Sequence, residues 1–246
     1  MSEIKWKIGV DVGGTFTDFS CERSNGERLA FKIPSTPQDP SKAVIIGVTE
    51  LITSHKLDPA DITLFTHGTT VATNAVLERK GAVVGLITTD GFRDVLEIGR
   101  QMRRQMYSVR LEPETPVFLA PGRRRVGVVE RIGPVGQVIT PLDEDSVIQA
   151  IKKLQSEGVT SLAVVLLFSF VNPTHEQRIR EIVFEHCPEM LVSLSSDVDP
   201  VFREYERSVV TAFDAYIKPT VDAYLSNLSQ VLRDKNVATS LQVMQS

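Results

Sequence analysis

Alternating apolar and polar positions at the start of the chain predict a three-stranded meander. Residues 6–12 run into Gly13-Gly14, and the alternation resumes beyond them, so residues 6–22 predict a strand, a tight turn and a returning strand. Asn25-Gly26 is typical of a second hairpin turn, and residues 28–33 have the composition of a third antiparallel strand. We therefore expect three consecutive antiparallel strands.

Helical and extended patterns then alternate. Apolar residues at helical spacing predict a helix over 41–52, with Ser41 as its N-cap. Short apolar runs at 62–65 and 83–88 predict buried strands, and another helical pattern begins at residue 71. A meander followed by alternating helices and strands predicts an α/β fold, with a mixed sheet and flanking helices.

The second half of the chain predicts a second α/β subdomain. An apolar run at 162–170 predicts the centre of another sheet, with helices at 142–158 and 173–186 around it. A strand at 191–195 precedes a helical region over 199–235, which Pro219 is expected to kink or break, and residues 240–245 predict a last strand. We expect one domain over residues 1–200, and a long helix with the first strand of a truncated further domain over 201–246.

Composition excludes several classes of protein. The 246 residues carry a formal net charge of −4, and the basic residues are spread widely, so a nucleic-acid surface is not expected. Cys21 and Cys187 are too few for a disulfide framework or a cysteine-rich zinc site, and they fit a reducing cytoplasm. No long apolar region follows the N-terminal lysines, and no apolar run is long enough to span a bilayer, so neither a signal peptide nor a membrane partner is expected.

The turn between the first two strands carries the most distinctive chemistry. In Asp11-Val12-Gly13-Gly14-Thr15-Phe16-Thr17-Asp18, two glycines and two threonines lie between two aspartates. Glycine lets a ligand approach the backbone closely, and the N–H groups of such a turn bind phosphate oxygens. Asp11 and Asp18 are placed to hold a hard cation such as Mg²⁺ against those phosphates. The alternative is a purely structural hairpin; the stretch is neither a Walker loop nor a dinucleotide fingerprint.

A second candidate site is His67-Gly68-Thr69-Thr70, where a strand is expected to run into a helix. Free N–H groups and the dipole at a helix N-terminus favour anions, so the cluster predicts a second anion or substrate contact. The alternative is a threonine N-cap beside a packed histidine, and for His67 alone the packed histidine is the simpler interpretation.

Arginines are concentrated over residues 100–125, between methionines, a tyrosine and prolines. A cationic surface that receives an acidic substrate is one interpretation. Ion-paired or solvated arginines are the more common one.

Six segments of the sequence together resemble the hydantoinase A/5-oxoprolinase family. They are residues 11–18, 67–79, 89–94, 129–131, 170–176 and 203–207. Because they follow the family's order over nearly the whole chain, the resemblance is specific, whereas the first segment alone is shared with sugar kinases.

The resemblance implies the fold of actin, sugar kinases and heat-shock ATPases, in which a ribonuclease H-like half and a second half close on ATP. In that fold the first hairpin holds the β- and γ-phosphates. The phosphate contacts implied here are Gly13, Gly14, Thr15 and Thr17, with Asp11 or Asp18 acting through Mg²⁺.

The resemblance also implies a reaction. Members of the family use ATP to open cyclic amides such as hydantoins and 5-oxoproline, and related subunits serve in ATP-dependent carboxylases of ketones. The implied step is phosphorylation of the amide oxygen, which gives a resistant carbonyl a good leaving group. A B-type subunit or domain is implied as the partner that completes hydrolysis.

The chain is short for this family. No glycine follows Gly158, so the second Gly-rich phosphate loop and the adenosine loop of actin-like ATPases are not expected here. We expect the N-terminal portion of a longer enzyme or a split subunit, with the C-terminal half of the A-type subunit as a further partner. The chain alone is expected to bind ATP poorly and to turn it over negligibly.

Two other functions stay open. A sugar kinase-like phosphotransferase would use the same hairpin, although two cysteines cannot supply the zinc cluster common in bacterial sugar kinases. A non-catalytic subunit that binds a partner in a carboxylase or hydantoinase complex would need no nucleotide.

Overall fold

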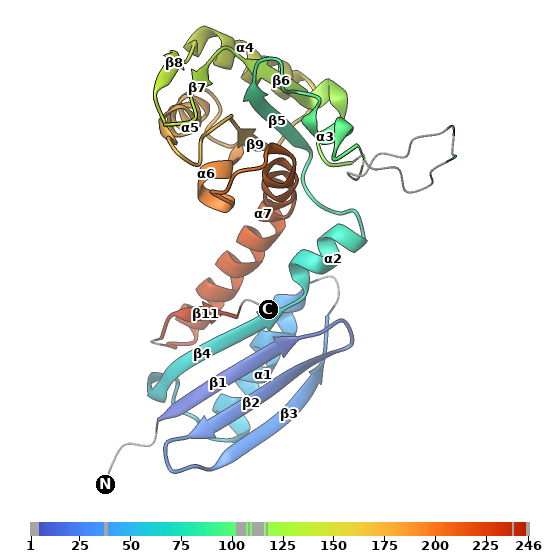
Figure 1. Cartoon of the computed structure of the whole chain (residues 1–246). Coiled ribbons are helices and arrows are strands. Elements are labelled where there is room, and N and C mark those ends of the chain that lie inside the picture. The colour runs from blue at the N-terminus through green and yellow to red at the C-terminus, as the bar shows by residue number, and fades with distance from the viewer. Residues whose placement is uncertain are drawn as a thin grey trace. The chain divides into compact units, whose positions relative to one another are not determined.

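The chain divides into two compact units. The computed structural model describes residues 5–36, 39–101, 107, 109, 116, 118–237 and 239–244 (Figure 1). The first unit comprises Met1–Lys80 and Thr220–Ser246, and the second comprises Gly81–Pro219. In sequence, the second unit is therefore an insertion between the two segments that build the first.

The first unit is built on a five-stranded sheet. Its elements are β1 (Trp6–Val12), β2 (Phe16–Arg23), β3 (Arg28–Pro34), α1 (Pro40–Ser54), a 3-10 turn (Pro59–Asp61), β4 (Ile62–Thr69), α2 (Val71–Leu77), the C-terminal part of α7 (Glu204–Asp234) and β11 (Leu241–Val243). The strand order is β11-β4-β1-β2-β3; β1 to β3 are antiparallel neighbours, and β4 and β11 run parallel to β1. This is the ribonuclease H-like order of actin-like ATPases, which confirms the expected fold class.

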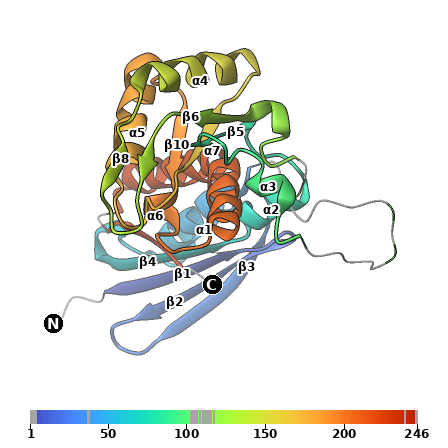
Figure 2. The ribbon, with the colours of Figure 1, turned by 45° about the horizontal axis from the view of Figure 1, so that its top comes forward.

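Side-chain alternation gives this sheet two different faces. In β1 the even-numbered residues from Trp6 to Val12 are buried, whereas Lys7 and Asp11 are exposed, because successive strand residues point to opposite sides. The helices that pack on the buried face contribute Val44, Val48 and Leu51 of α1 and Tyr224, Leu228 and Leu232 of α7. Figure 2 shows α1 along that face. The opposite face, called the open face below, keeps its polar side chains in solvent.

The second unit is a parallel α/β sheet with a small separate hairpin. Its elements are β5 (Val84–Thr89), α3 (Val95–Ile98), a 3-10 turn (Gly122–Arg124), β6 (Arg125–Val128), β7 (Arg131–Ile132), β8 (Val138–Thr140), α4 (Glu144–Ser156), β9 (Ser161–Val165), α5 (Thr174–His186), β10 (Leu191–Leu194), α6 (Ser195–Val198) and the N-terminal part of α7. The sheet order is β10-β9-β5-β6, and β7 pairs with β8. Both β5 and β9 are buried along their whole length, as central strands of a covered parallel sheet are. The expected second α/β subdomain is thus confirmed.

Two elements differ from the sequence expectation. The apolar run at 162–170 is a strand only as far as Val165, and the chain then turns, with Phe168 in the left-handed region at φ 57°. The sequence over residues 126–140 is also typical of a single hairpin, but β6 joins the parallel sheet and only β7 and β8 form a hairpin. Apolar residues in the sequence predict which positions are buried, but they do not predict which strands pair with each other.

Helix α7 belongs to both units. It begins in the second unit and ends in the first, and it is not broken at Pro219. The boundary expected at residue 200 does not coincide with either passage of the chain between the units, at residues 80–81 and 219–220. A linear reading of the sequence does not reveal that α7 returns to the first sheet, because that depends on the packing of Tyr224 and Leu228 against strands far away in sequence.

Both cysteines are free, as expected from the sequence, and both are buried. Burial raises the pKa of the Cys21 thiol to about 11, so the reactive thiolate is scarce at neutral pH. Over the part of the chain that the structure describes, no helix combines the length and apolarity needed to cross a bilayer.

Buried polar side chains meet at the carboxyl ends of the strands in the second unit. The N–H of Leu167 donates to the Thr89 hydroxyl at 3.0 Å, and this hydroxyl donates to Glu130. The second oxygen of Glu130 lies 2.8 Å from Nδ1 of His175. Since a carboxylate only accepts, this contact places the proton of the ring on Nδ1.

Glu176 fastens the loops that follow β9 and β10. Its fully buried carboxylate accepts from the N–H of Leu166 at 2.9 Å. The Ser195 hydroxyl donates to it at 2.6 Å and the Ser196 N–H at 2.9 Å. Arg207, also fully buried, donates to the carbonyl oxygen of Leu166 at 2.7 Å. Buried charges persist only where hydrogen bonds replace water, so this network holds the strand ends in one arrangement.

Removing Glu176 should therefore destabilise the chain strongly. Glu176→Ala leaves three donors without their acceptor and a buried arginine without its nearby counter-charge, so we expect a loss of about 3–5 kcal/mol in the free energy of unfolding. Glu181→Ala, which removes an exposed carboxylate from the same helix, is the matched control and should cost less than about 0.5 kcal/mol. Urea unfolding followed by circular dichroism measures both. Equal losses would show that the network does not hold the strand ends.

Candidate functional site

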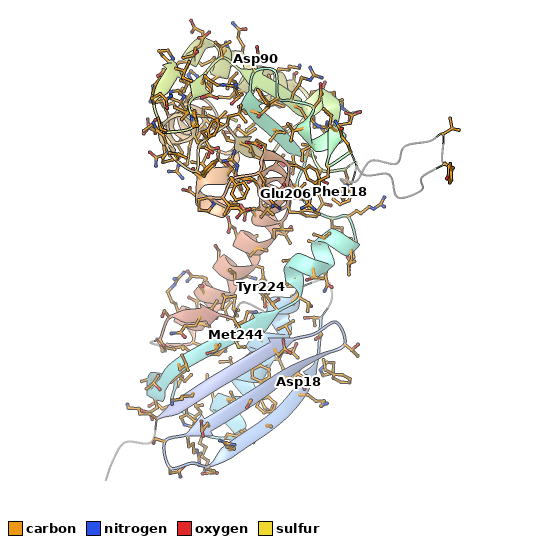
Figure 3. All side chains as sticks on the ribbon, viewed as in Figure 1. Asp18, Asp90, Phe118, Glu206, Tyr224 and Met244 are labelled. Carbon is orange, nitrogen blue, oxygen red and sulfur yellow. The ribbon has the colours of Figure 1, made fainter. Side chains whose placement is uncertain are left out.

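The two predicted aspartates lie opposite each other across the first hairpin. In the pairing of β1 with β2, Asp11 is the partner of Asp18, and the N–H of Gly13 donates to the carbonyl oxygen of Phe16 at 3.0 Å to close the turn. Directly opposite residues have Cβ atoms about 4.5–5.5 Å apart. Both carboxylates are exposed on the open face, where Figure 3 labels Asp18. The structure thus brings the two groups together.

The turn at residues 13–15 presents its backbone to solvent. Gly14 and Thr15 are exposed, and a Cβ added at Gly14 would meet nothing within 4 Å. A Cβ at Gly13 would lie 3.1 Å from the carbonyl oxygen of Phe16, so that glycine closes the turn. Gly14 has no positive φ either, so the fold itself does not require glycine there. A ligand that approaches the backbone closely is a reason for glycine at that position.

Thr17 points to the other face of the sheet. Its side chain is fully buried, and its hydroxyl lies 3.0 Å from the Ser35 hydroxyl, which donates to the carbonyl oxygen of Gly13 at 2.8 Å. The N–H of Ser35 also donates to the carbonyl oxygen of Thr15 at 2.9 Å. Thr17 and Ser35 therefore brace the turn from behind in this structure. Sequence reasoning missed Ser35, because no local pattern links it to a turn 22 residues earlier.

Gly68 lies beside Asp11 on the open face. β4 pairs with β1 so that Gly68 is the partner of Asp11, and a Cβ at Gly68 would lie 3.1 Å from Oδ1 of that aspartate. The absence of a side chain leaves a gap on one flank of the carboxylate. The structure thus joins residues of two separate predicted segments at one carboxylate.

The carboxylates and the gap have the chemistry of a magnesium site that shares its ion with phosphate. Mg²⁺ is commonly held by one or two carboxylates, with waters and phosphate oxygens as its other ligands. Asp11 and Asp18 supply such a pair, and the gap at Gly68 leaves space beside the first of them. Within the described ranges, no group of three or more His, Cys, Asp or Glu side chains forms a complete protein cage for a metal. The residues present therefore fit an ion that arrives with a nucleotide.

Two hollows border the hairpin within the first unit. One, of about 760 Å³, lies on the open face and is lined by the two aspartates, Lys32 and Gly68 among others. The other, of about 650 Å³, adjoins the turn at residues 13–14 and reaches Asn74 and Lys80. Both volumes fall in the range of small-molecule pockets. The sequence analysis did not identify Lys32, Lys80 or Asn74 as site residues, since each lies outside the glycine–threonine pattern.

His67 does not face the aspartates. It pairs with Val10 on the buried side of the sheet, is fully buried, and has Nε2 2.6 Å from the hydroxyl of Tyr224 on α7, which Figure 3 labels. Nδ1 is buried without a hydrogen-bond partner among the described residues. Burial lowers the pKa of His67 to about 4, although the Asp11 charge opposes this. The side chain lies in the core, as the interpretation of a packed histidine requires.

Thr69 and Thr70 connect β4 to α2. Thr69 accepts from the N–H of Val71 at 3.2 Å, and the Thr70 hydroxyl donates to the carbonyl oxygen of Val12 at 3.3 Å. Both threonines line the open-face hollow, but only Thr70 is exposed and also lines the hollow at the turn. Thr70 is therefore the more accessible of the two, while Thr69 fixes the start of the helix.

The predicted site residues thus fall into two groups. The residues around the accessible side of the hairpin are Asp11, Gly13, Gly14, Thr15, Asp18, Gly68, Thr69 and Thr70. The fully buried ones are Thr17 and His67.

The other segments of the family resemblance meet elsewhere. They contribute Thr89, Glu130, His175, Glu176 and Arg207, which form the buried network at the strand ends of the second unit. The sequence marked these segments, but it gave no sign that they meet.

Half of the arginine-rich stretch at 100–125, including Arg103, Arg104 and Arg110, lies outside the described residues. Arg125 is buried and donates to the carbonyl oxygen of Ala120 at 2.6 Å and to Glu97 at 3.1 Å. Arg123 is paired with Glu157 at 3.0 Å. These two arginines follow the ion-paired interpretation.

The buried histidine predicts a loss of stability in acid. His67 titrates near 6.5 when unfolded and near 4 in the fold, so below pH 6.5 the unfolded chain binds more protons and stability falls until about pH 4. Compared with His67→Gln, the wild type should lose up to about 1.4 kcal/mol more per pH unit in this window.

Urea unfolding at a series of pH values from 7.5 to 4 tests this expectation. His186→Gln, at an exposed position, is the control and should keep the wild-type slope. Parallel pH dependences of the wild type and His67→Gln would contradict the assignment.

Comparison with known proteins agrees with the segments quoted from the sequence. Residues 7–187 match the family described as the hydantoinase/oxoprolinase N-terminal region. The matched span includes the hairpin, Gly68 and most of the second unit.

Two enzymes illustrate the relationship in sequence. The 5-oxoprolinase of Saccharomyces cerevisiae is 31% identical over an alignment of 280 residues, and this alignment covers 98% of this chain and 21% of that enzyme. The caprolactamase subunit alpha of Pseudomonas jessenii is 33% identical over 252 residues, which cover 100% of this chain and 36% of the subunit. The chain thus spans about a third or less of the length of these relatives.

The folds agree as well. The crystal structure of the ATP-dependent caprolactamase from Pseudomonas jessenii has a TM-score of 0.85 at 32% identity, over 97% of this chain and 35% of that one. A nucleotide-free structure of acetone carboxylase, described with ATP-dependent acetone carboxylation, has a TM-score of 0.85 at 27% identity, over 98% and 36%. The chain therefore belongs to the hydantoinase/oxoprolinase family.

Proposed function

We propose that this chain is the N-terminal part of an ATP-dependent enzyme that activates the carbonyl of a cyclic amide, a lactam or an imide, by phosphorylation. The observation that carries the proposal is the first hairpin, which offers an exposed glycine turn beside two carboxylates in a member of this family. Its relatives are an oxoprolinase and an ATP-dependent caprolactamase, whose names refer to cyclic amides.

The hairpin residues have distinct roles in this proposal. The backbone N–H groups at Gly14 and Thr15 donate to phosphate oxygens, because these residues are exposed and no described residue lies within 4 Å of a Cβ built at Gly14. Gly13 closes the turn, and Thr17 fixes it from behind. Thr70 extends the same accessible surface from the start of α2.

The aspartates lie where a counter-ion of the phosphates would bind. Asp11 or Asp18 would hold Mg²⁺, which when bound would neutralise charge on the transferring phosphoryl group, and Gly68 leaves the side of Asp11 toward β4 without a side chain.

The chemical step follows from the inertness of an amide. The carbonyl oxygen attacks the terminal phosphorus of ATP, the bond from that phosphorus to the bridging oxygen breaks, and ADP leaves with the electron pair. Water then adds to the activated ring carbon, and the C–N bond breaks as the nitrogen takes up a proton, which opens the ring to an acyl phosphate. A second water displaces phosphate from this acyl phosphate and leaves the carboxylate. The protein contributes positioning and charge neutralisation.

Further protein is needed for the whole reaction. The caprolactamase relative is one subunit of an enzyme, and this chain spans about a third of the length of that subunit (36%). We propose a hydantoinase B-type subunit or domain and the rest of an A-type subunit as partners. They would supply the second phosphate loop and the hydrolytic step.

Gly14→Ala tests whether the turn binds nucleotide. The added methyl meets nothing within 4 Å, so the free energy of unfolding should change by less than about 0.5 kcal/mol. Magnesium–ATP binding, followed by nuclear magnetic resonance at millimolar nucleotide because the chain alone binds weakly, should fall about tenfold or more as backbone contacts are blocked.

Gly122→Ala is the matched control, because a Cβ there is 4.0 Å from its nearest neighbour, Oε2 of Glu97, in the second unit. It should leave both stability and binding unchanged. Unaltered nucleotide binding in Gly14→Ala would contradict the proposed contact.

Substrate class is tested with the partner subunits present. We expect ATP-dependent phosphate release to rise with 5-oxoproline, hydantoin or caprolactam, and not with hexoses, because the proposed acceptor is an amide oxygen. Stimulation by hexoses alone would identify a sugar kinase-like phosphotransferase. Assembly with a B-type subunit but no nucleotide binding would identify a non-catalytic subunit.

A further inference from the structure

One cross-strand row on the open face runs through the proposed phosphate site. Gly68 pairs with Asp11, Asp11 with Asp18, and Asp18 with Lys32, so residues from β4, β1, β2 and β3 follow one another across the sheet. All four line the hollow of about 760 Å³. The two aspartates differ sharply in what lies beside them, and that difference assigns them separate roles.

Asp18 has a cation on its outer side. Nζ of Lys32 lies 3.9 Å from Oδ1 of Asp18 and 5.3 Å from the ring centroid of Phe16, which is two residues nearer the turn. The ammonium is thus directed along the face toward the end of the hairpin. With the lysine side chain 64% exposed and the aspartate 60% exposed, the pair is weak and easily rearranged.

Among the described residues, the strand neighbour of Asp11 on its other side carries no charge. Gly68 occupies the adjacent position, and even a Cβ there would approach Oδ1 to 3.1 Å. The side of this carboxylate toward β4 therefore carries no other side chain at this position, and the hollow of about 760 Å³ opens beside both residues. Near one end of the row, Asp11 can bind a cation. At the other end, Lys32 supplies one.

A polyphosphate at the turn needs positive charge that the turn itself lacks. Residues 11–18 contain two aspartates and no basic residue. Among the residues that line the two hollows at the hairpin, the lysines are Lys32 and Lys80. Lys80 is already paired with Glu78 at 2.6 Å, a closer ion pair than that of Lys32. Of these two lysines, Lys32 therefore gives up the weaker ion pair when it binds a phosphate.

We propose that Lys32 binds the phosphates of the nucleotide at this hairpin, that Asp18 and Phe16 position its ammonium, and that Asp11 alone faces the magnesium ion. This inference rests on the proposed function. A charge-assisted hydrogen bond from the ammonium to phosphate replaces a long, solvated contact to Asp18. The contact favours polyphosphates over a monophosphate, because it depends on the phosphates that reach beyond the turn.

Lys32→Gln and Lys7→Gln form the decisive pair of variants. Lys7 lies on the same face of β1, four residues before Asp11 and about 13 Å from it, so it controls for the loss of one positive charge. The probes are magnesium tripolyphosphate and AMP, titrated into the whole chain and followed by nuclear magnetic resonance. Lys32→Gln should weaken the affinity for tripolyphosphate about fivefold to tenfold, while Lys7→Gln should change this affinity less than about twofold.

Two further variants test the division of roles. Asp11→Asn should abolish the enhancement of tripolyphosphate binding by magnesium, whereas Asp18→Asn should keep it, because Asp18 serves the lysine. Lys32→Arg should retain most of the affinity, and AMP binding should not respond to any change at Lys32. Circular dichroism confirms that each variant is folded.

The outcomes separate this inference from the proposed function. If the wild type binds neither magnesium–ATP nor tripolyphosphate, the proposed function fails, and this inference fails with it. If the wild type binds both and Lys32→Gln behaves like Lys7→Gln, the role of Lys32 alone is refuted. If Asp18→Asn loses the magnesium enhancement as Asp11→Asn does, the separation of the two aspartates is refuted.

Discussion

The site depends on one register, that of β1 against β2. Their pairing sets Asp11 opposite Asp18 on one face and Val12 opposite Thr17 on the other. Because side chains alternate along a strand, a slip of one residue would bury the carboxylates and expose the core. The register is fixed by the buried residues of β1 and by the hydrogen bonds that close and brace the turn. The packing that stabilises the sheet therefore also orients the polar groups proposed to bind nucleotide.

The same alternation extends across the neighbouring strands. In the parallel pairing of β4 with β1, His67 falls on the core side with Val10, and Gly68 falls on the open side with Asp11. Adjacent residues of one segment thus have opposite roles. His67 holds α7 through Tyr224, whereas Gly68 keeps space at a carboxylate. The proposed contact of Lys32 with phosphate follows from the same geometry, since β3 continues the row beyond Asp18.

The second unit has its own buried organisation. Glu130, His175, Glu176 and Arg207 come from segments far apart in sequence, and they meet where the parallel strands end. Such a network is stable only when its charged groups are satisfied together, so its members depend on one another. The described residues place these groups away from solvent, which fits a role in holding the strand ends.

The sequence by itself determined the strands of the meander, most helices, the α/β class, the glycine turn with its flanking aspartates, and the family. Those features are local, because periodicity, turn chemistry and short motifs depend on residues close together in the chain. Only the tertiary structure decided that Thr17 and His67 face the core, that Ser35 braces the turn, and that α7 returns to the first sheet. It also decided that Gly68 adjoins Asp11 and that β6 pairs with β5. These outcomes depend on which strands pair and in what register. Strands pair through backbone hydrogen bonds, and because these groups are the same in nearly every residue, the sequence does not specify the partner strand locally.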